Sequence, residues 1–166
     1  MDGVLAFVIP VQEADFIVRP AAQRLAPERH YPPTVAHVTL WGCPAVNGAD
    51  DPVLLPAFEL FARADPFDCQ LVRVERFPSG TFYFPPEPPK PFSTLTNALR
   101  DFYPGCDPYG GAHDELVPHV GMYMDGDEES ASDAAAHLPI RFRATRARLT
   151  SYGRVNCYDI AQFTIG

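Results

Sequence analysis

The chain has 166 residues, of which 46% are hydrophobic and 20% are charged, and its formal net charge is −8 at pH 7. A long nucleic acid is bound through many Lys and Arg contacts to phosphate, so this charge argues against a protein that coats RNA or DNA. No apolar run is long enough to cross a membrane, and the N-terminus lacks the basic residues of a signal peptide. We therefore expect a cytoplasmic, monomeric protein without membrane contact, with residues 1–166 forming a single domain.

The first part of the chain alternates between strand and helix patterns. The apolar run at 4–10 predicts a buried strand. Residues 13–26 have helical spacing, although Pro20 must lie near the start of the helix or at a kink. A turn-rich segment leads to a predicted strand at 35–41, and 52–64 is a second predicted helix with proline at its first turn.

The middle of the chain is rich in aromatic residues and proline. Alternating polarity over 68–77 predicts one strand, and a short aromatic strand at 81–84 follows a turn. The prolines at 85–91 argue against regular structure there. An amphipathic helix is predicted at 92–103, and the Gly, Pro and Asp residues of 104–115 indicate a loop.

The last third is mainly strand-like. We predict a strand at 116–124, and then an acidic stretch at 125–133 that starts a helix running to about residue 137, where acidic side chains oppose the positive end of the helix dipole. Two long strands, 140–151 and 155–165, close the chain and are predicted to pair as a hairpin. Together these elements predict an α+β fold in which sheets are covered by helices.

The sequence gives no sign of a metal or cofactor site. Its four cysteines are widely spaced and form no Cys-x-x-Cys pair, so we expect reduced, structural thiols. The acidic stretch is most simply a solvated helix start. Gly-rich nucleotide loops of the Walker or G-x-G-x-x-G type are absent from the sequence. We expect no bound metal and no cofactor.

Two of the predicted strands carry matching motifs, HVTL at 37–40 and HVGM at 119–122, with the histidines 119 − 37 = 82 residues apart. Because side chains on a strand alternate between its faces, one face of each strand presents a histidine, the residue two places on, and an aromatic ring. These residues are His37, Thr39 and Trp41 in the first strand and His119, Gly121 and Tyr123 in the second. A lone histidine in a strand is usually structural, but a repeated one predicts a shared site.

Two histidines on one site suit the opening of a phosphodiester. One must take a proton from water and the other must give a proton to the departing ribose oxygen, and a reference pKa of about 6.5 permits both states near neutral pH. His37 and His119 are the predicted catalytic residues. Thr39 would donate a hydrogen bond to a phosphate oxygen as charge builds there. The sequence does not determine which histidine is the base.

These motifs resemble those of the 2H phosphoesterase superfamily, whose signature is a pair of H-x-[T/S]-hydrophobic motifs, and within it the 2′-5′ RNA ligase-like, or LigT-like, branch. The resemblance covers most of the chain. It extends to residues 75–85 (ERFPSGTFYFP), to Pro118 directly before the second histidine, and to the closing residues 163–166.

The resemblance implies a bilobal α+β fold, with two pseudo-symmetric antiparallel sheet halves flanked by helices and a central cleft. It also implies metal-independent chemistry on a 2′,3′-cyclic phosphate or 2′-5′ phosphodiester of a nucleotide or short RNA end, in RNA processing. We expect hydrolysis rather than ligation.

The second motif departs from the family pattern, because Gly121 stands where a Thr or Ser is expected. Losing one transition-state donor can cost about 3 kcal/mol. A backbone N–H or water can replace the hydroxyl, or the glycine can make room for a bulkier substrate. The alternative is a weakened site that serves as a nucleotide- or RNA-end-binding module. If instead the likeness is accidental and the chain is an interaction domain, the histidines will not share a cleft.

Four further residues are candidates for substrate contact. Trp41, Phe77 and Tyr123 have aromatic faces that can stack on a nucleobase, although packing in the core or at its rim explains each equally well. Arg154, in the predicted hairpin turn, could reach a phosphate. The arginines between 141 and 148 do not share one strand face, so we expect them to pair with carboxylates at the surface.

Overall fold

The computed structural model describes residues 3–112, 116–123 and 127–166. The predictions made for 113–115, in the loop, and for 124–126, at the end of a strand and the start of the acidic stretch, lie outside this range. The helices are α1 (Asp15–Leu25), α2 (Leu55–Arg63), α3 (Lys90–Phe102) and α4 (Glu128–Ala135), with short 3-10 helices at Gln12–Ala14 and Pro52–Leu54. The strands are β1 (Val4–Pro10), β2 (His37–Gly42), β3 (Phe67–Leu71), β4 (Glu75–Arg76), β5 (Phe82–Phe84), β6 (Pro86–Glu87), β7 (Val120–Gly121), β8 (Ile140–Ala144), β9 (Arg146–Tyr152) and β10 (Cys157–Thr164).

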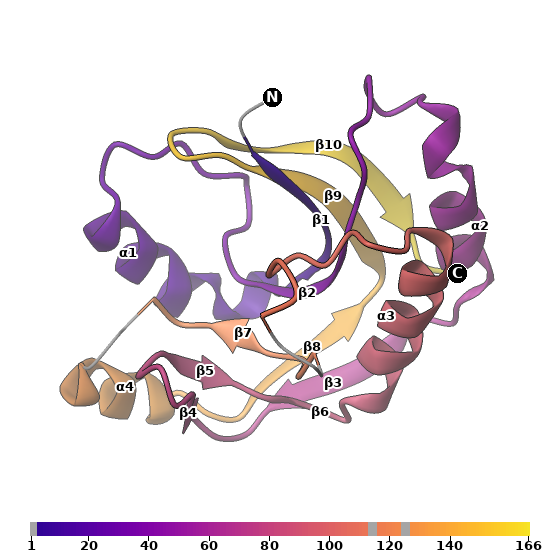
Figure 1. Ribbon diagram of the computed structural model, residues 1–166. Coiled ribbons are helices and arrows are strands. Elements are labelled where there is room, and N and C mark those ends of the chain that lie inside the picture. Colours follow the sequence, from indigo (N-terminus) through magenta and orange to yellow (C-terminus); the bar gives the residue numbers. More distant parts are fainter. Residues whose placement is uncertain (1–2, 113–115, 124–126) are drawn as a thin grey trace.

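The strands form two antiparallel sheets with helices around them (Figure 1), which confirms the predicted α+β class. In the described residues, one sheet has seven strands in the order β10-β9-β1-β2-β7-β5-β4. The other has three, in the order β6-β3-β8. The hydrogen-bonded sheets are therefore unequal in size, and both histidine motifs belong to the larger one. No helix of the described residues is long and apolar enough to cross a membrane.

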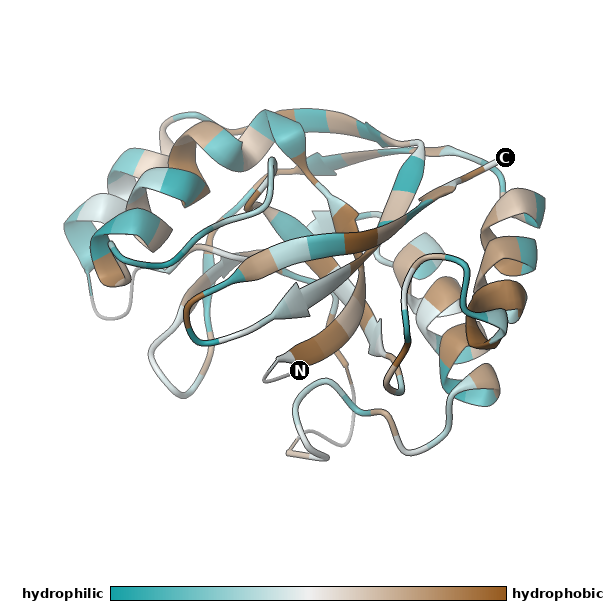
Figure 2. Cartoon of the chain, turned by 90° about the horizontal axis from the view of Figure 1, so that it is seen from above, coloured by the Kyte–Doolittle hydropathy of each residue, from teal (hydrophilic) through white to brown (hydrophobic). Residues whose placement is uncertain are grey.

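Helices α2 and α3 cover one face of the seven-stranded sheet with hydrophobic side chains. Phe7 of β1 is fully buried there, with its ring centroid 6.3 Å from that of Phe61 in α2 and 5.4 Å from that of Tyr103 after α3. Figure 2 shows hydrophobic residues on β1 and on the two helices at the right. Burial of such aromatic rings is the main stabilising contribution to this layer. The opposite face of the sheet is not covered by these two helices.

The predicted amphipathic helix at 92–103 is present as α3, which packs against both sheets. Phe92 is fully buried and lies edge-on to Phe67 of β3, with centroids 5.0 Å apart, and near Phe142 of β8. Leu99 is also buried, whereas Phe102 is 47% exposed. The predicted apolar stripe therefore ends one turn before the helix does.

Two of the predicted strands are each divided between the sheets. The segment 68–77 becomes β3, in the smaller sheet, and β4, in the larger one. The segment 140–151 likewise becomes β8 and β9, with Thr145 between them. These two predictions were wrong because each segment was treated as one strand although its alternation slips at the crossing, where Leu71 and Val72 are both apolar and Thr145 and Arg146 are both polar. Such a slip does not tell which sheet the next segment joins.

Other boundaries also differ from prediction. Of the described part of the predicted strand, 116–123, only Val120–Gly121 is paired as β7, and Pro118 has no N–H to donate to a ladder. The proline cluster holds the two-residue edge strand β6, where a missing N–H is tolerated. Pro20 lies inside α1. The predicted β9–β10 hairpin is confirmed, with the Gly153 N–H donating to the Asn156 carbonyl at 2.9 Å.

Candidate active site

The two histidine motifs lie next to each other in the seven-stranded sheet. Strands β2 and β7 are antiparallel, with Val38 opposite Val120. This register places Thr39 opposite His119 and His37 opposite Gly121, so each histidine faces the other motif's hydroxyl position. The two histidines are then diagonal neighbours, with a separation on the order of 7–8 Å between their backbones. The structure thus brings together the pair that the sequence singled out.

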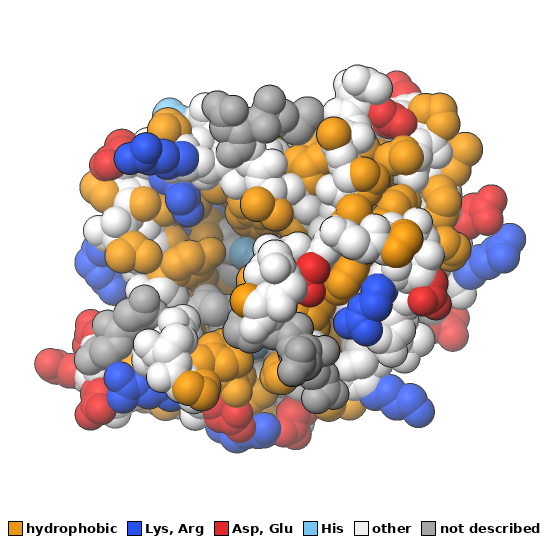
Figure 3. Space-filling view, in the orientation of Figure 1, with side chains coloured by type: hydrophobic (Ala, Val, Ile, Leu, Met, Phe, Trp, Pro, Cys, Tyr) orange, Lys and Arg blue, Asp and Glu red, His pale blue; other side chains and the backbone are white. Residues whose placement is uncertain are grey.

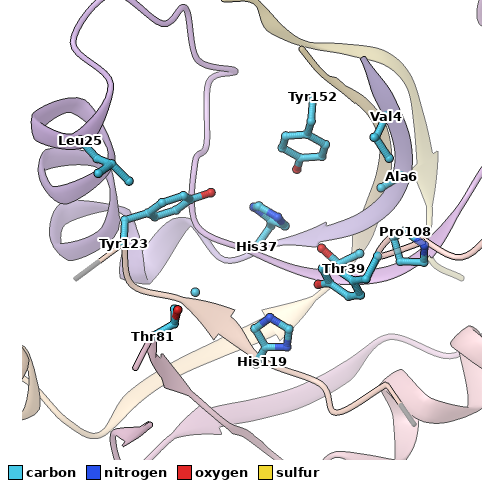
Figure 4. Close-up of a pocket in the computed structure, with 12 residues that line it drawn as sticks. Val4, Ala6, Leu25, His37, Thr39, Thr81, Pro108, His119, Tyr123 and Tyr152 are labelled. Atoms are coloured by element: carbon cyan, nitrogen blue, oxygen red, sulfur yellow. The ribbon is translucent and has the colours of Figure 1, made fainter. Parts of the chain in front are cut away.

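A cavity of about 450 Å³ opens over these two strands. It is lined by Val4, Ala6, Leu25, His37, Thr39, Thr81, Pro108, Tyr109, His119, Gly121, Tyr123 and Tyr152. Figure 3 shows a histidine at the base of a hollow walled mainly by hydrophobic side chains, and Figure 4 shows the lining residues. None of the described residues that line it is Lys, Arg, Asp or Glu. Among the residues described, no group of three or more His, Cys, Asp or Glu side chains is placed to hold a metal ion.

Both histidine rings are held by the same local contact. The Nδ1 of His37 is 2.7 Å from the Val35 carbonyl oxygen, and the Nδ1 of His119 is 2.7 Å from that of Val117. A carbonyl only accepts hydrogen bonds, so Nδ1 carries a hydrogen in each ring. The basic nitrogen of the neutral ring is then Nε2, which is the tautomer suited to proton transfer at that atom.

His37 is the more deeply buried of the pair. Burial lowers the pKa of His37 from its usual 6.5 to about 4. The hydrogen bond to the Val35 carbonyl acts in the opposite direction, and the positive charges of Arg148 and His119 add to the lowering. At neutral pH the His37 ring is therefore uncharged and able to accept a proton.

A buried carboxylate fixes the segment that precedes His37. Asp15 of α1 is 7% exposed, and its Oδ1 accepts hydrogen bonds from the backbone N–H groups of Val35, at 2.7 Å, and Ala36, at 2.8 Å. Its Oδ2 accepts from Arg19 Nε at 2.9 Å. The carbonyl that orients His37 thus belongs to a peptide segment held by a charge-assisted network.

Arg148 holds the same segment from β9. Its guanidinium donates to the Thr34 carbonyl at 3.0 Å and to Asp159 at 2.9 Å. The expectation that the arginines between 141 and 148 pair at the surface is met by Arg143, which is exposed and 2.9 Å from Asp68. It fails for Arg148, which is only 5% exposed, because β9 turns this side chain toward the protein interior.

The His119 ring is surrounded by aromatic side chains. Phe77 lies edge-on to it at 5.0 Å, the Tyr83 ring centroid is 5.8 Å away, and Tyr109 lies at 6.3 Å with its ring inclined by 30°. Phe77 is also stacked on Tyr83 at 3.9 Å. Phe77 therefore contacts the histidine itself rather than the pocket interior, which makes it a support for the ring.

Gly121 leaves open space in the pocket. A Cβ atom added there would meet no heavy atom of the described residues within 4 Å, so a larger residue would fit among them. Tyr123, two residues on, has a φ of 55°, a left-handed conformation that costs a non-glycine residue about 1 kcal/mol or more. Its side chain lines the pocket and extends toward His37 (Figure 4).

Trp41 does not belong to the site, contrary to the sequence prediction. Consecutive residues of β1 pair with Thr39 and Trp41, so Leu40 is the extra residue of a β-bulge. The bulge turns the Trp41 side chain to the face opposite His37. There it is 4% exposed and its Nε1 donates to the Tyr103 carbonyl at 2.8 Å.

Arg154 is exposed in the β9–β10 turn and is not one of the described residues that line the pocket, so the prediction that it contacts phosphate has no support in this geometry. Sequence reasoning also missed Tyr109 and Tyr152, which do line it. Tyr109 lies in a loop and Tyr152 at the end of a strand, so no motif marked either one.

Solved structures of similar fold cover almost the whole chain. Escherichia coli LigT complexed with 3′-AMP is 21% identical, with a TM-score of 0.60 and 98% of each chain covered. E. coli LigT complexed with NADP+ is 19% identical, again with a TM-score of 0.60 and 98% of each chain covered. The protein TT0787 of Thermus thermophilus is 14% identical, with a TM-score of 0.58, covering 98% of this chain and 97% of its own. No curated protein matches the chain.

At these identities the structural likeness establishes the class of fold, which is that of LigT. The 2′-5′ RNA ligase superfamily matches residues 9–156, nearly the whole length. The chain belongs to the 2′-5′ RNA ligase superfamily, as the two histidine motifs predicted.

Proposed function

We propose that this protein is a metal-independent phosphoesterase that hydrolyses a 2′,3′-cyclic phosphate or a 2′-5′ phosphodiester of a nucleotide or short RNA end. The observation that carries the proposal is the placement of His37 and His119 on one pocket, each with Nδ1 bonded to a carbonyl and Nε2 as the basic nitrogen. The LigT complex with 3′-AMP supports a nucleotide as the ligand class.

In the proposed mechanism His37 is the general base. Its lowered pKa keeps the ring neutral at pH 7, so Nε2 takes a proton from a water molecule whose oxygen attacks phosphorus. The bond from phosphorus to one ribose oxygen breaks with its electron pair, and protonated His119 gives its Nε2 proton to that oxygen. The products are a phosphate monoester and a free ribose hydroxyl. Proton exchange with solvent then restores both histidines.

The other pocket residues have supporting roles in this proposal. Thr39, directly opposite His119, donates a hydrogen bond to a non-bridging phosphate oxygen, and this bond strengthens as charge develops there. Tyr123 offers an aromatic face to the nucleobase. Phe77 holds the His119 ring in place.

A second candidate is a nucleotide- or RNA-end-binding module in which catalysis is weakened. The specific observation in its favour is Gly121, which leaves the position opposite His37 without a hydroxyl. Both candidates use the same pocket, and they differ in turnover.

The proposal is tested by incubating the protein with each 2′,3′-cyclic nucleotide in EDTA and identifying the product by chromatography. We expect a nucleoside monophosphate to form without added metal, and to be lost in His37→Ala and His119→Ala. Tight binding without turnover would favour the binding module, and equal turnover in the wild type and both variants would refute the mechanism.

A further inference from the structure

The pocket has few groups to hold an anion. A phosphodiester carries one negative charge, yet no Lys or Arg is among the described residues that line the cavity. Binding must therefore rely on neutral donors together with a protonated histidine. Within the two motifs, Thr39 supplies a hydroxyl and Gly121, at the matching position in β7, supplies none. The other described lining residues with hydroxyl groups are Thr81, Tyr109, Tyr123 and Tyr152.

Tyr152, at the end of β9, has an unsatisfied hydroxyl at this pocket. The oxygen is shielded from solvent and has no hydrogen-bond partner among the described residues. The Thr150 hydroxyl on the same strand already donates to Asp159 at 2.8 Å. Its interaction with Tyr152 opposes the rise in pKa that burial causes in the tyrosine, but the two hydroxyls do not meet the geometry of a hydrogen bond. A buried polar group left unpaired costs about 1–3 kcal/mol, which a bound ligand would offset.

The position of Tyr152 suits contact with the reacting group. Its ring packs against the His37 ring, with centroids 5.2 Å apart and planes inclined by 30°. Strand pairing with Val4 on one side and Cys157 on the other fixes its backbone. Figure 4 shows the hydroxyl directed into the pocket toward His37. A ligand bound at the Nε2 of His37 would therefore lie on the side of the pocket to which this hydroxyl points.

We propose that the Tyr152 hydroxyl donates a hydrogen bond to a non-bridging oxygen of the phosphodiester, and so supplies the second hydroxyl donor that Gly121 lacks. This inference rests on the proposed function and names a substrate-binding residue for it. Burial raises the pKa of Tyr152, so the hydroxyl keeps its proton at any pH at which the histidines act. Tyr152 then supplies the donor that is absent at Gly121, so the glycine does not indicate a weakened site.

The test compares Tyr152→Phe with Tyr158→Phe, the same change at a tyrosine that is 46% exposed. We expect kcat/KM for 2′,3′-cyclic nucleotides to fall about 10- to 100-fold in Tyr152→Phe. The loss should be equal for all four bases, because the phosphate is common to them. Tyr158→Phe should stay within about twofold of wild type. A loss that depends on the base would assign the hydroxyl to the nucleobase edge and overturn the proposal.

A second variant tests the replacement directly. Gly121→Thr should restore most of the activity lost in Tyr152→Phe, and should raise the wild-type rate far less. Because Tyr152→Phe removes an unpaired buried hydroxyl, its thermal midpoint should be unchanged or higher. A lower midpoint with no rescue would indicate a structural role and overturn the proposal.

A measurement of phosphate binding distinguishes failure of this inference from failure of the proposed function. If the wild type turns over no cyclic nucleotide, the affinity for inorganic phosphate still tests Tyr152. We expect Tyr152→Phe to bind phosphate about tenfold more weakly than Tyr158→Phe. Equal affinities would overturn the proposal whether or not the protein is an enzyme.

Discussion

Removal of the Asp15 carboxylate is predicted to lower the stability of the fold and to disturb the segment that orients His37. In Asp15→Ala, the two buried N–H groups of Val35 and Ala36 lose the carboxylate oxygen that lies 2.7 and 2.8 Å away. Each unpaired buried N–H costs about 1–3 kcal/mol. Arg19 still donates to the Pro32 and Pro33 carbonyls in this variant, so its lost bond to Asp15 adds little to the change in the free energy of unfolding. We therefore expect the two unpaired N–H groups together to lower the free energy of unfolding by about 2–6 kcal/mol.

The assay is urea unfolding at pH 7, with Asp15→Asn as the matched variant. The asparagine keeps one carbonyl oxygen that can accept from the same N–H groups, so we expect it to lose about 1–2 kcal/mol. Because this segment also carries the carbonyl that orients His37, kcat should fall in Asp15→Asn by more than KM rises. A loss below about 1 kcal/mol in Asp15→Ala would refute the reasoning.

Further predictions concern single residues. Because the pKa of His37 is about 4 when folded and 6.5 normally, the unfolded chain takes up this proton first as the pH falls. The contribution of this difference to the free energy of unfolding is fully present above pH 6.5 and is lost as the pH falls to 4, by up to about 3 kcal/mol. The free energy of unfolding of His37→Phe, measured against pH, should not show this loss. Gly121→Thr should change the unfolding free energy by less than about 0.5 kcal/mol in urea titration, since its Cβ meets open space. Trp41→Phe should lose about 1 kcal/mol, from the bond to Tyr103, at unchanged KM. Arg154→Ala should leave kcat/KM within about twofold, and a larger loss would return this residue to the site.

The motif pair was the part of the site that the sequence could predict. A strand period of two places His37 with Thr39, and a matched second strand places His119 with Gly121. Their adjacency follows once the two strands pair. A strand period of two does not reveal a β-bulge. The extra residue Leu40 moves the side chains that follow it in β2 to the opposite face of the sheet, which is why the prediction for Trp41 was wrong.

The remaining errors arise where long-range packing decides the structure. At the crossings between sheets, after β3 and near Thr145, the alternation of polar and apolar residues slips by one position, but the slip does not tell which sheet the next segment joins. Asp15 lies in a helix, and its partners at 35–36 are known only when the chain has folded. Tyr152 enters the site from β9, where no motif marks a ligand contact. These residues belong to the site through tertiary contacts, which one sequence does not encode as a local pattern.

The central claim is that His37 and His119 act together on one phosphate. It is tested most directly by kcat/KM for a 2′,3′-cyclic nucleotide in His37→Ala, His119→Ala and the double variant. Each single change should cost about 10²–10⁴-fold, and the double variant should be no slower than the slower single variant, because residues that act as a unit are not additive. A double variant slowed by the product of the two single losses would contradict the account.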